Sequence, residues 1–200
     1  MILVDEDLKI HWEEGTGALN WHSEFGNNNP VEIEIGIGKG RFLLNSAQNK
    51  PDVNFLGIEW AKKYLSFAQE RAWKRKLYNI RFLRADAKKV IEEAIPPGSV
   101  AAFHIYFPDP WPKRRHHKRR FFQPDTVVKI VESLIPDGKL LIATDYKEYF
   151  EWIMRVVSEN IRLKPIPMDS ADLLLGRTNY EIKYLNEGRP IFNAFFQKIT

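Results

Sequence analysis

Apolar runs of strand length alternate with amphipathic runs of helix length along most of this chain. The predicted strands cover residues 31–35, 53–58, 79–83, 100–106, 139–143 and 191–198. The predicted helices open at residue 41 and cover 61–76, 88–95, 122–134 and 145–159, and a short helical piece precedes the last strand. Strands that alternate with helices form a parallel sheet with helices on both faces. The pattern therefore predicts an α/β fold around a mostly parallel central sheet.

The length and composition favour a single domain over residues 1–200, with residues 1–30 packing on or beside it. No apolar run approaches the ~18 residues of a membrane helix, and the acidic start is unlike a secretory signal. The chain has no cysteine, which excludes disulfides, thiolate metal sites and cysteine nucleophiles. We expect a cytoplasmic protein.

The charged residues are segregated along the chain. Residues 1–60 carry 4 basic and 10 acidic side chains, whereas residues 61–90 carry 10 basic and 2 acidic ones. Residues 113–120 add six more cations. This distribution indicates a basic face and a polyanionic partner. The alternative is an ordinary solvated, lysine-rich helix surface.

Carboxylates follow several of the predicted strands. Glu59, Asp86, Asp109 and Asp145 stand at or just after the ends of successive strands, and Glu34 lies next to the end of the first. In open α/β sheets, ligands bind past the carboxyl ends of the strands, where an acid after the second strand accepts hydrogen bonds from ribose hydroxyls. An acid after the third strand suits an adenine amino group. These positions predict an adenosine pocket.

A glycine-rich turn follows the first strand. Gly36, Gly38 and Gly40 allow the backbone to approach a ligand closely, although glycines in such turns are often purely structural. The dinucleotide fingerprint requires a third glycine where this chain has Arg41. The motif with Glu34 before it instead suits a cofactor with an amino group and no pyrophosphate. That cofactor is S-adenosyl-L-methionine.

The fourth strand runs into a rigid corner, Phe107-Pro108-Asp109-Pro110-Trp111-Pro112. Because proline fixes φ, Asp109 and Trp111 are held with little loss of entropy on binding. The indole of Trp111 offers a stacking surface for a purine. It equally suits a core indole that covers the sheet edge.

A cationic flap follows this corner. It comprises Lys113, Arg114, Arg115, His116, His117, Lys118, Arg119 and Arg120. Cations at this density repel one another unless an anion is present, so the flap suits phosphate contacts. The alternative is a solvated charge run. No acid or cysteine lies within the flap, so we predict no metal site there.

Four motifs together resemble the bacterial tRNA (guanine-N7)-methyltransferase family. They are EIEIGIGKG (32–40), FPDPWPKRRHHKRR (107–120), ATDY (143–146) and TNYE (178–181). The resemblance covers the chain from about Trp21 to its end. It implies a Rossmann-like class I S-adenosylmethionine-dependent methyltransferase fold, with methyl transfer to N7 of a guanine in the tRNA variable loop. We infer no obligatory protein partner and no membrane, and we expect a monomer or homodimer.

The resemblance also implies a role for each matching residue. Asp109 would be catalytic. The cofactor would contact Glu34, Gly36, Gly38, Gly40, Glu59, Asp86 and Asp109. The guanosine would contact Lys113, Asp145, Thr178, Asn179, Tyr180 and Glu181. The RNA would contact Arg115, His116, His117, Lys118, Arg119 and Arg120.

Two other functions compete with this interpretation. A nicotinamide-dependent oxidoreductase would need the missing third glycine and a Ser-Tyr-Lys or histidine proton relay, which the sequence lacks. An RNA-binding module with a vestigial cofactor fold would bind tRNA without methyl transfer, yet all the predicted pocket carboxylates are present.

Overall fold

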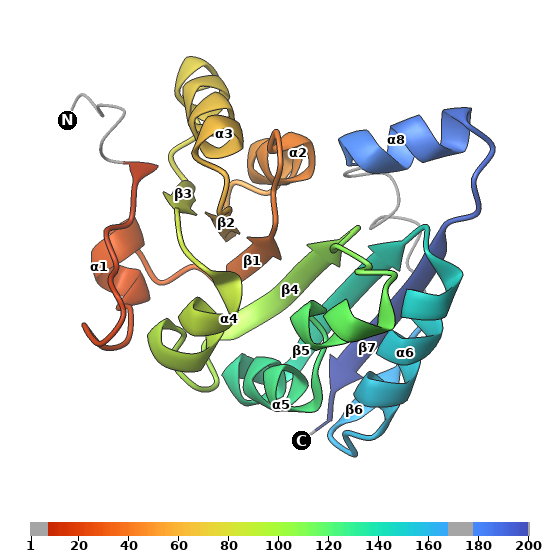
Figure 1. Ribbon diagram of the computed structural model, residues 1–200. Coiled ribbons are helices and arrows are strands. Elements are labelled where there is room, and N and C mark those ends of the chain that lie inside the picture. Colours follow the sequence, from red (N-terminus) through yellow and green to blue (C-terminus); the bar gives the residue numbers. More distant parts are fainter. Residues whose placement is uncertain (1–7, 168–177, 200) are drawn as a thin grey trace.

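The computed structural model describes residues 8–167 and 178–199. Its centre is a seven-stranded sheet with the order β3-β2-β1-β4-β5-β7-β6 (Figure 1). The strands are β1 (Val31–Ile35), β2 (Asn54–Ile58), β3 (Ile80–Leu83), β4 (Val100–Tyr106), β5 (Leu134–Thr144), β6 (Leu163–Pro165) and β7 (Phe192–Lys198). Strands β1 to β5 pair in parallel, and β7 runs antiparallel to β5 and β6. The predicted mostly parallel sheet is confirmed.

Helices cover both faces of this sheet (Figure 1). They are α1 (Trp21–Phe25), α2 (Arg41–Asn49), α3 (Lys62–Lys74), α4 (Ala87–Lys89), α5 (Pro124–Ser133), α6 (Lys147–Ser158) and α8 (Asn179–Asn186). A π-helical turn, Val90–Ala94, continues α4, and a 3-10 helix spans Arg114–Arg119. Within the two described ranges, no helix has the length and apolar character needed to cross a membrane.

Successive side chains of β1 point to opposite faces of the sheet, where two separate apolar clusters lie. Ile33 and Ile35 join the larger apolar cluster, which holds residues of α5 and α6. The smaller cluster lies on the other face and holds residues of α2 and α3. Glu32 and Glu34 alternate with the isoleucines, so they point toward the α2 side of the sheet. Two carboxylates are thereby placed beneath the helix that follows the glycine turn.

The N-terminal segment packs against the rest of the chain. Ile10, Leu19 and Phe25 are buried in the larger apolar cluster, and the N–H of Ile10 donates to the carbonyl of Phe82 at 2.9 Å. Burial of each such side chain stabilises the fold by roughly 1.5–3 kcal/mol. The assignment of the whole chain to one domain stays a prediction.

Two strands differ from the sequence expectation. β5 begins at Leu134 and not near Lys139, since Leu134 pairs with Val100 before the register shifts to Ala102 and Lys139. Asp137 has φ +61°, so the Pro-Asp-Gly segment forms a kink within the strand. β6 lies outside all the predicted strands.

The chain crosses from one face of the sheet to the other between β1 and β4, which are neighbours in the sheet. The connection after β1 runs through α2, and the one after β4 runs through α5 on the opposite face. Ligands of open α/β sheets bind past the carboxyl ends of the strands at such a point. The glycine turn follows β1, and Asp109 follows β4.

Candidate functional site

The glycine turn joins β1 to α2 in a left-handed backbone conformation. Gly36, Gly38 and Gly40 have φ values of 73°, 52° and 71°. A Cβ on Gly40 would lie 2.7 Å from the Cβ of Ala68 in α3, closer than real Cβ atoms approach. Gly40 is therefore required for the packing of α2 on α3, whereas Gly36 and Gly38 face the cavity described below.

The carboxyl group of Glu34 is buried at the start of α2, with only 3% of the residue exposed. Burial raises its pKa well above the usual value, and the nearby Glu59 carboxylate adds to this; a hydrogen bond from the Leu43 backbone acts in the opposite direction. Among the described residues, Glu34 Oε2 has no hydrogen-bond partner. A buried, unsatisfied oxygen beside a cavity fits a ligand that brings a donor or a positive charge.

Glu59 stands directly after β2, as predicted, and is bound to the glycine turn. Its Oε2 accepts from the backbone N–H of Gly38 and its Oε1 from that of Ala61, each at 2.9 Å. These contacts fix the position of the carboxylate at the entrance to α3. Each oxygen keeps a further lone pair that a ligand hydroxyl can use.

A cavity of about 230 Å³ lies over the glycine turn. It is lined by Glu34, Gly36, Ile37, Gly38, Lys39, Arg41, Phe42, Tyr64, Tyr106, Thr178, Asn179, Tyr180 and Lys183. The cavity joins the turn to the first residues of α8, which lie 142 positions away along the chain when counted from Gly36 to Thr178. The structure thus brings part of the predicted cofactor set together with part of the predicted guanosine set.

Several lining residues were not predicted from the sequence. Tyr106 could have been found, because it is the last residue of β4 and so ends at the ligand-binding edge. Tyr64 and Lys183 carried no such signal, since each lies on a helix and reaches the cavity only through the packing of α3 and α8.

The start of α8 closes over the corner that follows β4. Thr178 Oγ1 accepts from the N–H of Glu181 at 3.0 Å, so the threonine caps the helix. The ring of Tyr180 lies 6.3 Å from that of Phe107, between centroids. Burial raises the pKa of Tyr180, and neighbouring Tyr64, Asp109 and Glu59 raise it further. The charges of the two predicted carboxylates, Asp109 and Glu59, thus act on the Tyr180 hydroxyl.

The other predicted residues lie outside the lining of the cavity. Asp86 is exposed and caps α4, because its Oδ1 accepts from the N–H of Lys88 at 2.8 Å. Asp145, directly after β5, accepts from Arg189 Nη1 at 3.1 Å. Lys113 is exposed and Glu181 is half-buried. Asp86 and Asp145 lie past the carboxyl ends of β3 and β5, outside the cavity lining.

The proline corner has an unusual backbone. Phe107 and Trp111 both have positive φ values, of 52° and 43°. Bulky residues adopt this region only under constraint, at a cost of about 1–3 kcal/mol each, and such positions cluster at functional sites.

The two predicted side chains of this corner, Asp109 and Trp111, differ in exposure. Asp109 is exposed after the end of β4. Trp111 is half-buried, and the guanidinium of Arg119 lies 5.1 Å from the centroid of its ring. Its indole packs against the flap in this structure.

The flap forms a 3-10 helix whose cations differ in exposure. Arg115, Lys118 and Arg119 are exposed, and His116 and His117 are half-buried. Among the residues with described coordinates, no group of three or more His, Cys, Asp or Glu could hold a metal ion. The exposed cations are available to phosphates.

Arg120 differs from the rest of the flap, because it is completely buried. Its Nη2 donates to Glu148 Oε1 at 3.0 Å, its Nε donates to the carbonyl of Pro110 at 2.9 Å, and its guanidinium lies 5.0 Å from the ring centroid of Tyr149. The expectation that Arg120 contacts RNA does not fit this position. Arg120 instead links the proline corner to α6, through its contacts with Pro110 and Glu148.

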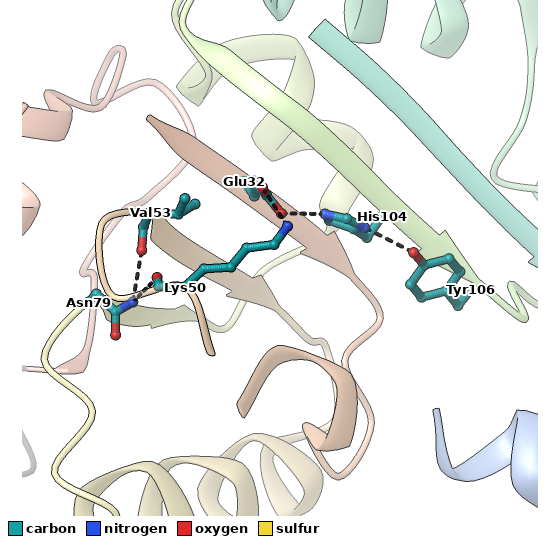
Figure 2. Close-up of polar contacts among 6 residues, drawn as sticks. All are labelled: Glu32, Lys50, Val53, Asn79, His104 and Tyr106. Carbon is teal, nitrogen blue, oxygen red and sulfur yellow. Dashed lines mark hydrogen bonds and ion pairs between the residues drawn. The ribbon is translucent and has the colours of Figure 1, made fainter. Parts of the chain in front are cut away.

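A series of polar contacts links Lys50, Glu32, His104 and Tyr106, the last of which lines the cavity (Figure 2). Lys50 Nζ lies 3.2 Å from Glu32 Oε1, Glu32 Oε2 lies 2.8 Å from His104 Nε2, and His104 Nδ1 lies 2.9 Å from the hydroxyl of Tyr106. Burial by itself raises the pKa of Glu32, but His104 and Lys50 outweigh it and lower the pKa to about 2. Glu32 is therefore ionised. Through His104, it helps to position the hydroxyl of Tyr106 in the cavity lining.

Sequence comparisons place the chain among methyltransferases. A family model described as "Putative methyltransferase" matches residues 28–194. The tRNA (guanine-N(7)-)-methyltransferase of Listeria innocua serovar 6a is 38% identical over 192 residues, which cover 94% of this chain and 85% of that protein. The protein of the same description from Nitrosococcus oceani is 34% identical over 184 residues, covering 92% of this chain and 78% of the relative.

Solved structures share the fold at low sequence identity. The 16S rRNA methyltransferase KamB matches with a TM-score of 0.63 and 14% identity, over 88% of this chain and 91% of that one. The phosphoethanolamine N-methyltransferase 2 of Haemonchus contortus, solved with S-adenosyl-L-methionine, matches with a TM-score of 0.54 and 16% identity. That match covers 94% of this chain and 54% of the other. The predicted class I methyltransferase fold is confirmed.

Proposed function

The chain belongs to the tRNA (guanine-N7)-methyltransferase family and methylates N7 of guanine in tRNA with S-adenosyl-L-methionine, and we propose that the cavity over the glycine turn is where it does so. The unsatisfied carboxyl oxygen of Glu34 carries this proposal. The ammonium group of the cofactor would lie there and restore the charge of the buried acid, because a nearby cation favours the ionised form.

The remaining cofactor contacts follow from the strand ends. Glu59 accepts from the ribose hydroxyls with the lone pairs that Gly38 and Ala61 leave available. Gly36 and Gly38 let the backbone approach the cofactor closely, and Gly40 allows α2 to pack against α3. Asp86, outside the cavity lining, accepts a hydrogen bond from the adenine amino group. S-adenosyl-L-methionine supplies an electrophilic methyl group on its sulfonium.

The chain's own residues align and stabilise the purine. N7 of guanine carries an exposed lone pair, so neither a general base nor an enzyme nucleophile is needed, and alignment supplies much of the rate. The purine gains positive charge as it is methylated. A fixed carboxylate nearby favours that charge, and Asp109, held between two prolines, performs this role.

The guanosine lies between the proline corner and α8. Its contacts are Lys113, Asp145, Thr178, Asn179, Tyr180 and Glu181. The acids among them can accept from the N1 and N2 hydrogens of guanine, and Tyr180 supplies a partly exposed ring next to Phe107. The exposed part of the flap, Arg115 to Arg119, contacts the phosphates of the tRNA.

Finer features of the function rest on the family alone. The target guanine lies in the variable loop, and the enzyme acts as a single domain in the cytoplasm, where its tRNA substrate is found. It works as a monomer or homodimer without another protein.

The experiment that tests this function uses labelled S-adenosyl-L-methionine and bulk tRNA, followed by nucleoside analysis. We expect label in 7-methylguanosine; label in another nucleoside, or none, contradicts the proposal. Asp109→Asn should reduce the single-turnover rate about a hundredfold at saturating substrates, whereas Asp125→Asn, at the start of α5, should not. A rate for Asp109→Asn within about threefold of wild type would show that its charge is not catalytic.

A further inference from the structure

One face of α3 carries exposed aromatic rings beside guanidinium groups. Tyr64, Phe67, Arg71 and Arg75 recur at intervals of three and four residues, which places them along one stripe of the helix. Tyr64 and Phe67 are 39% and 46% exposed. Arg41, the first residue of α2, lies close enough to lower the pKa of Arg71. These five residues are called the α3 platform.

Two guanidinium groups of the platform contact neutral groups. Arg71 Nη1 donates to the carbonyl of Lys39 at 3.1 Å, and its guanidinium lies 5.6 Å from the ring centroid of Phe67. Arg75 Nη1 lies 3.3 Å from Asn45 Oδ1. In the part of the chain that the structure describes, Arg41, Arg71 and Arg75 are absent from the ion pairs. Among the described residues, no carboxylate therefore forms an ion pair with these three guanidinium groups.

Like charges in one place cost free energy unless a bound anion offsets them. Burial lowers the pKa of Arg71, and the charges of Arg75 and Arg41 lower it further, as expected of crowded cations. The two helices that carry the platform pack closely, because a Cβ on Gly40 would lie only 2.7 Å from the Cβ of Ala68 in α3.

The platform is continuous with the cavity. Tyr64 and Arg41 belong both to the platform and to the cavity lining. Trp60, which follows Glu59 at the start of this face, is 68% exposed. Figure 1 shows α2 and α3 side by side, away from the flap that follows β4. An RNA held at the cavity can therefore extend over α3 as well as over the flap.

We propose that the α3 platform is a second tRNA-binding surface. Bases of unpaired nucleotides stack on Phe67 and Tyr64, and their phosphates contact Arg41, Arg71 and Arg75. Aromatic rings interleaved with cations are the features by which proteins hold single-stranded nucleic acid, since every base has a face that can stack. This inference rests on the proposed function, because tRNA is the polyanion that the enzyme must bind.

Two variants test the platform without touching the cavity lining. In the presence of S-adenosylhomocysteine, Phe67→Ala and Arg75→Gln should each weaken tRNA binding about tenfold. The log–log salt dependence should become shallower by roughly 0.7 for Arg75→Gln and stay unchanged for Phe67→Ala, because only the first removes a phosphate contact. A single-stranded oligouridylate should compete through Phe67, and a blunt RNA duplex should not.

Matched controls lie on α5, on the opposite face of the sheet. Val128 is 44% exposed, and Lys129 pairs with Glu132 on the surface. Val128→Ala and Lys129→Gln should bind tRNA as the wild type does. All four variants should bind S-adenosylhomocysteine normally, which shows that the cavity is intact.

Three outcomes would overturn the inference. Wild-type tRNA affinity in both platform variants would show that the stripe is a solvated surface. Equal losses in the α5 controls would show a nonspecific charge effect. A wild-type dimer that Phe67→Ala converts to a monomer in sedimentation would make the face an interface between copies. If wild type methylates tRNA and Lys118→Gln in the flap weakens binding, the proposed function stands whichever result the platform variants give.

Discussion

The buried guanidinium of Arg120 donates through Nη2 to both carboxylate oxygens of Glu148, at 3.0 and 3.1 Å. Because its Nε also donates to the carbonyl of Pro110, this one side chain ties the proline corner to α6. The corner carries Asp109 immediately before Pro110, so the position of the proposed catalytic carboxylate depends on an ion pair outside the cavity.

Arg120→Gln should therefore lower both stability and activity. We expect a loss of about 1–3 kcal/mol in the free energy of unfolding, since buried groups would lose charged hydrogen bonds. Urea denaturation measures it. The control is Arg119→Gln, which removes an exposed cation next in sequence and should weaken tRNA binding with little change in stability. Equal stability of the two variants would contradict the role given to Arg120.

Gly40→Ala should destabilise the fold more than Gly98→Ala. Both glycines have positive φ values, 71° and 59°, so both substitutions carry backbone strain of about 1 kcal/mol or more. Only at Gly40 would the new Cβ meet another atom, the Cβ of Ala68 at 2.7 Å. Thermal and urea unfolding measure the loss in the free energy of unfolding for each variant, and the difference between the two losses is the cost of the contact with Ala68. Equal losses would show that α2 and α3 can move apart without cost.

Glu34 should make the stability of the ligand-free protein depend on pH. Its pKa is raised in the folded state, so above pH 4.5 the unfolded chain loses this proton while the folded protein keeps it. The contribution of Glu34 to stability is then lost as pH rises from the unfolded pKa toward the folded one. Glu34→Gln should flatten this fall in urea denaturation between pH 5 and pH 8.

The same residue should release a proton when the cofactor binds. An ammonium group beside Glu34 favours the carboxylate, so binding to wild type should transfer a proton to the buffer. Calorimetry in buffers of different ionisation enthalpy measures this transfer. Glu34→Gln should abolish it, and an unchanged proton count in that variant would remove Glu34 from the cofactor site.

Glu59→Ala should weaken S-adenosyl-L-methionine binding about tenfold to a hundredfold, because a charged hydrogen bond contributes roughly 1.5–3 kcal/mol. The affinity for tRNA should hardly change. Glu132→Ala on α5 is the matched control, since that carboxylate is 43% exposed and lies on the other face. Calorimetric titration that gives the same cofactor affinity for Glu59→Ala and wild type would exclude the ribose contact.

The sequence alone determined the order of the strands and helices, since apolar period and turn residues are local properties. It also placed Glu59, Asp86, Asp109 and Asp145 at one edge of the sheet, because parallel strands end together. Glu34 was singled out as the acid that precedes the glycine turn. The family resemblance then gave these positions their chemistry, and the comparisons bear out the family.

Only the tertiary structure decided which residues share the cavity. Thr178 and Tyr180 reach the glycine turn because α8 folds back over β4, and Tyr64 reaches it through the packing of α3. Arg120 reads as one cation among many in the sequence, yet its burial against Glu148 and Tyr149 separates it from its neighbours. Burial and long-range contacts depend on how distant segments pack, and a local pattern of residue types does not contain that information.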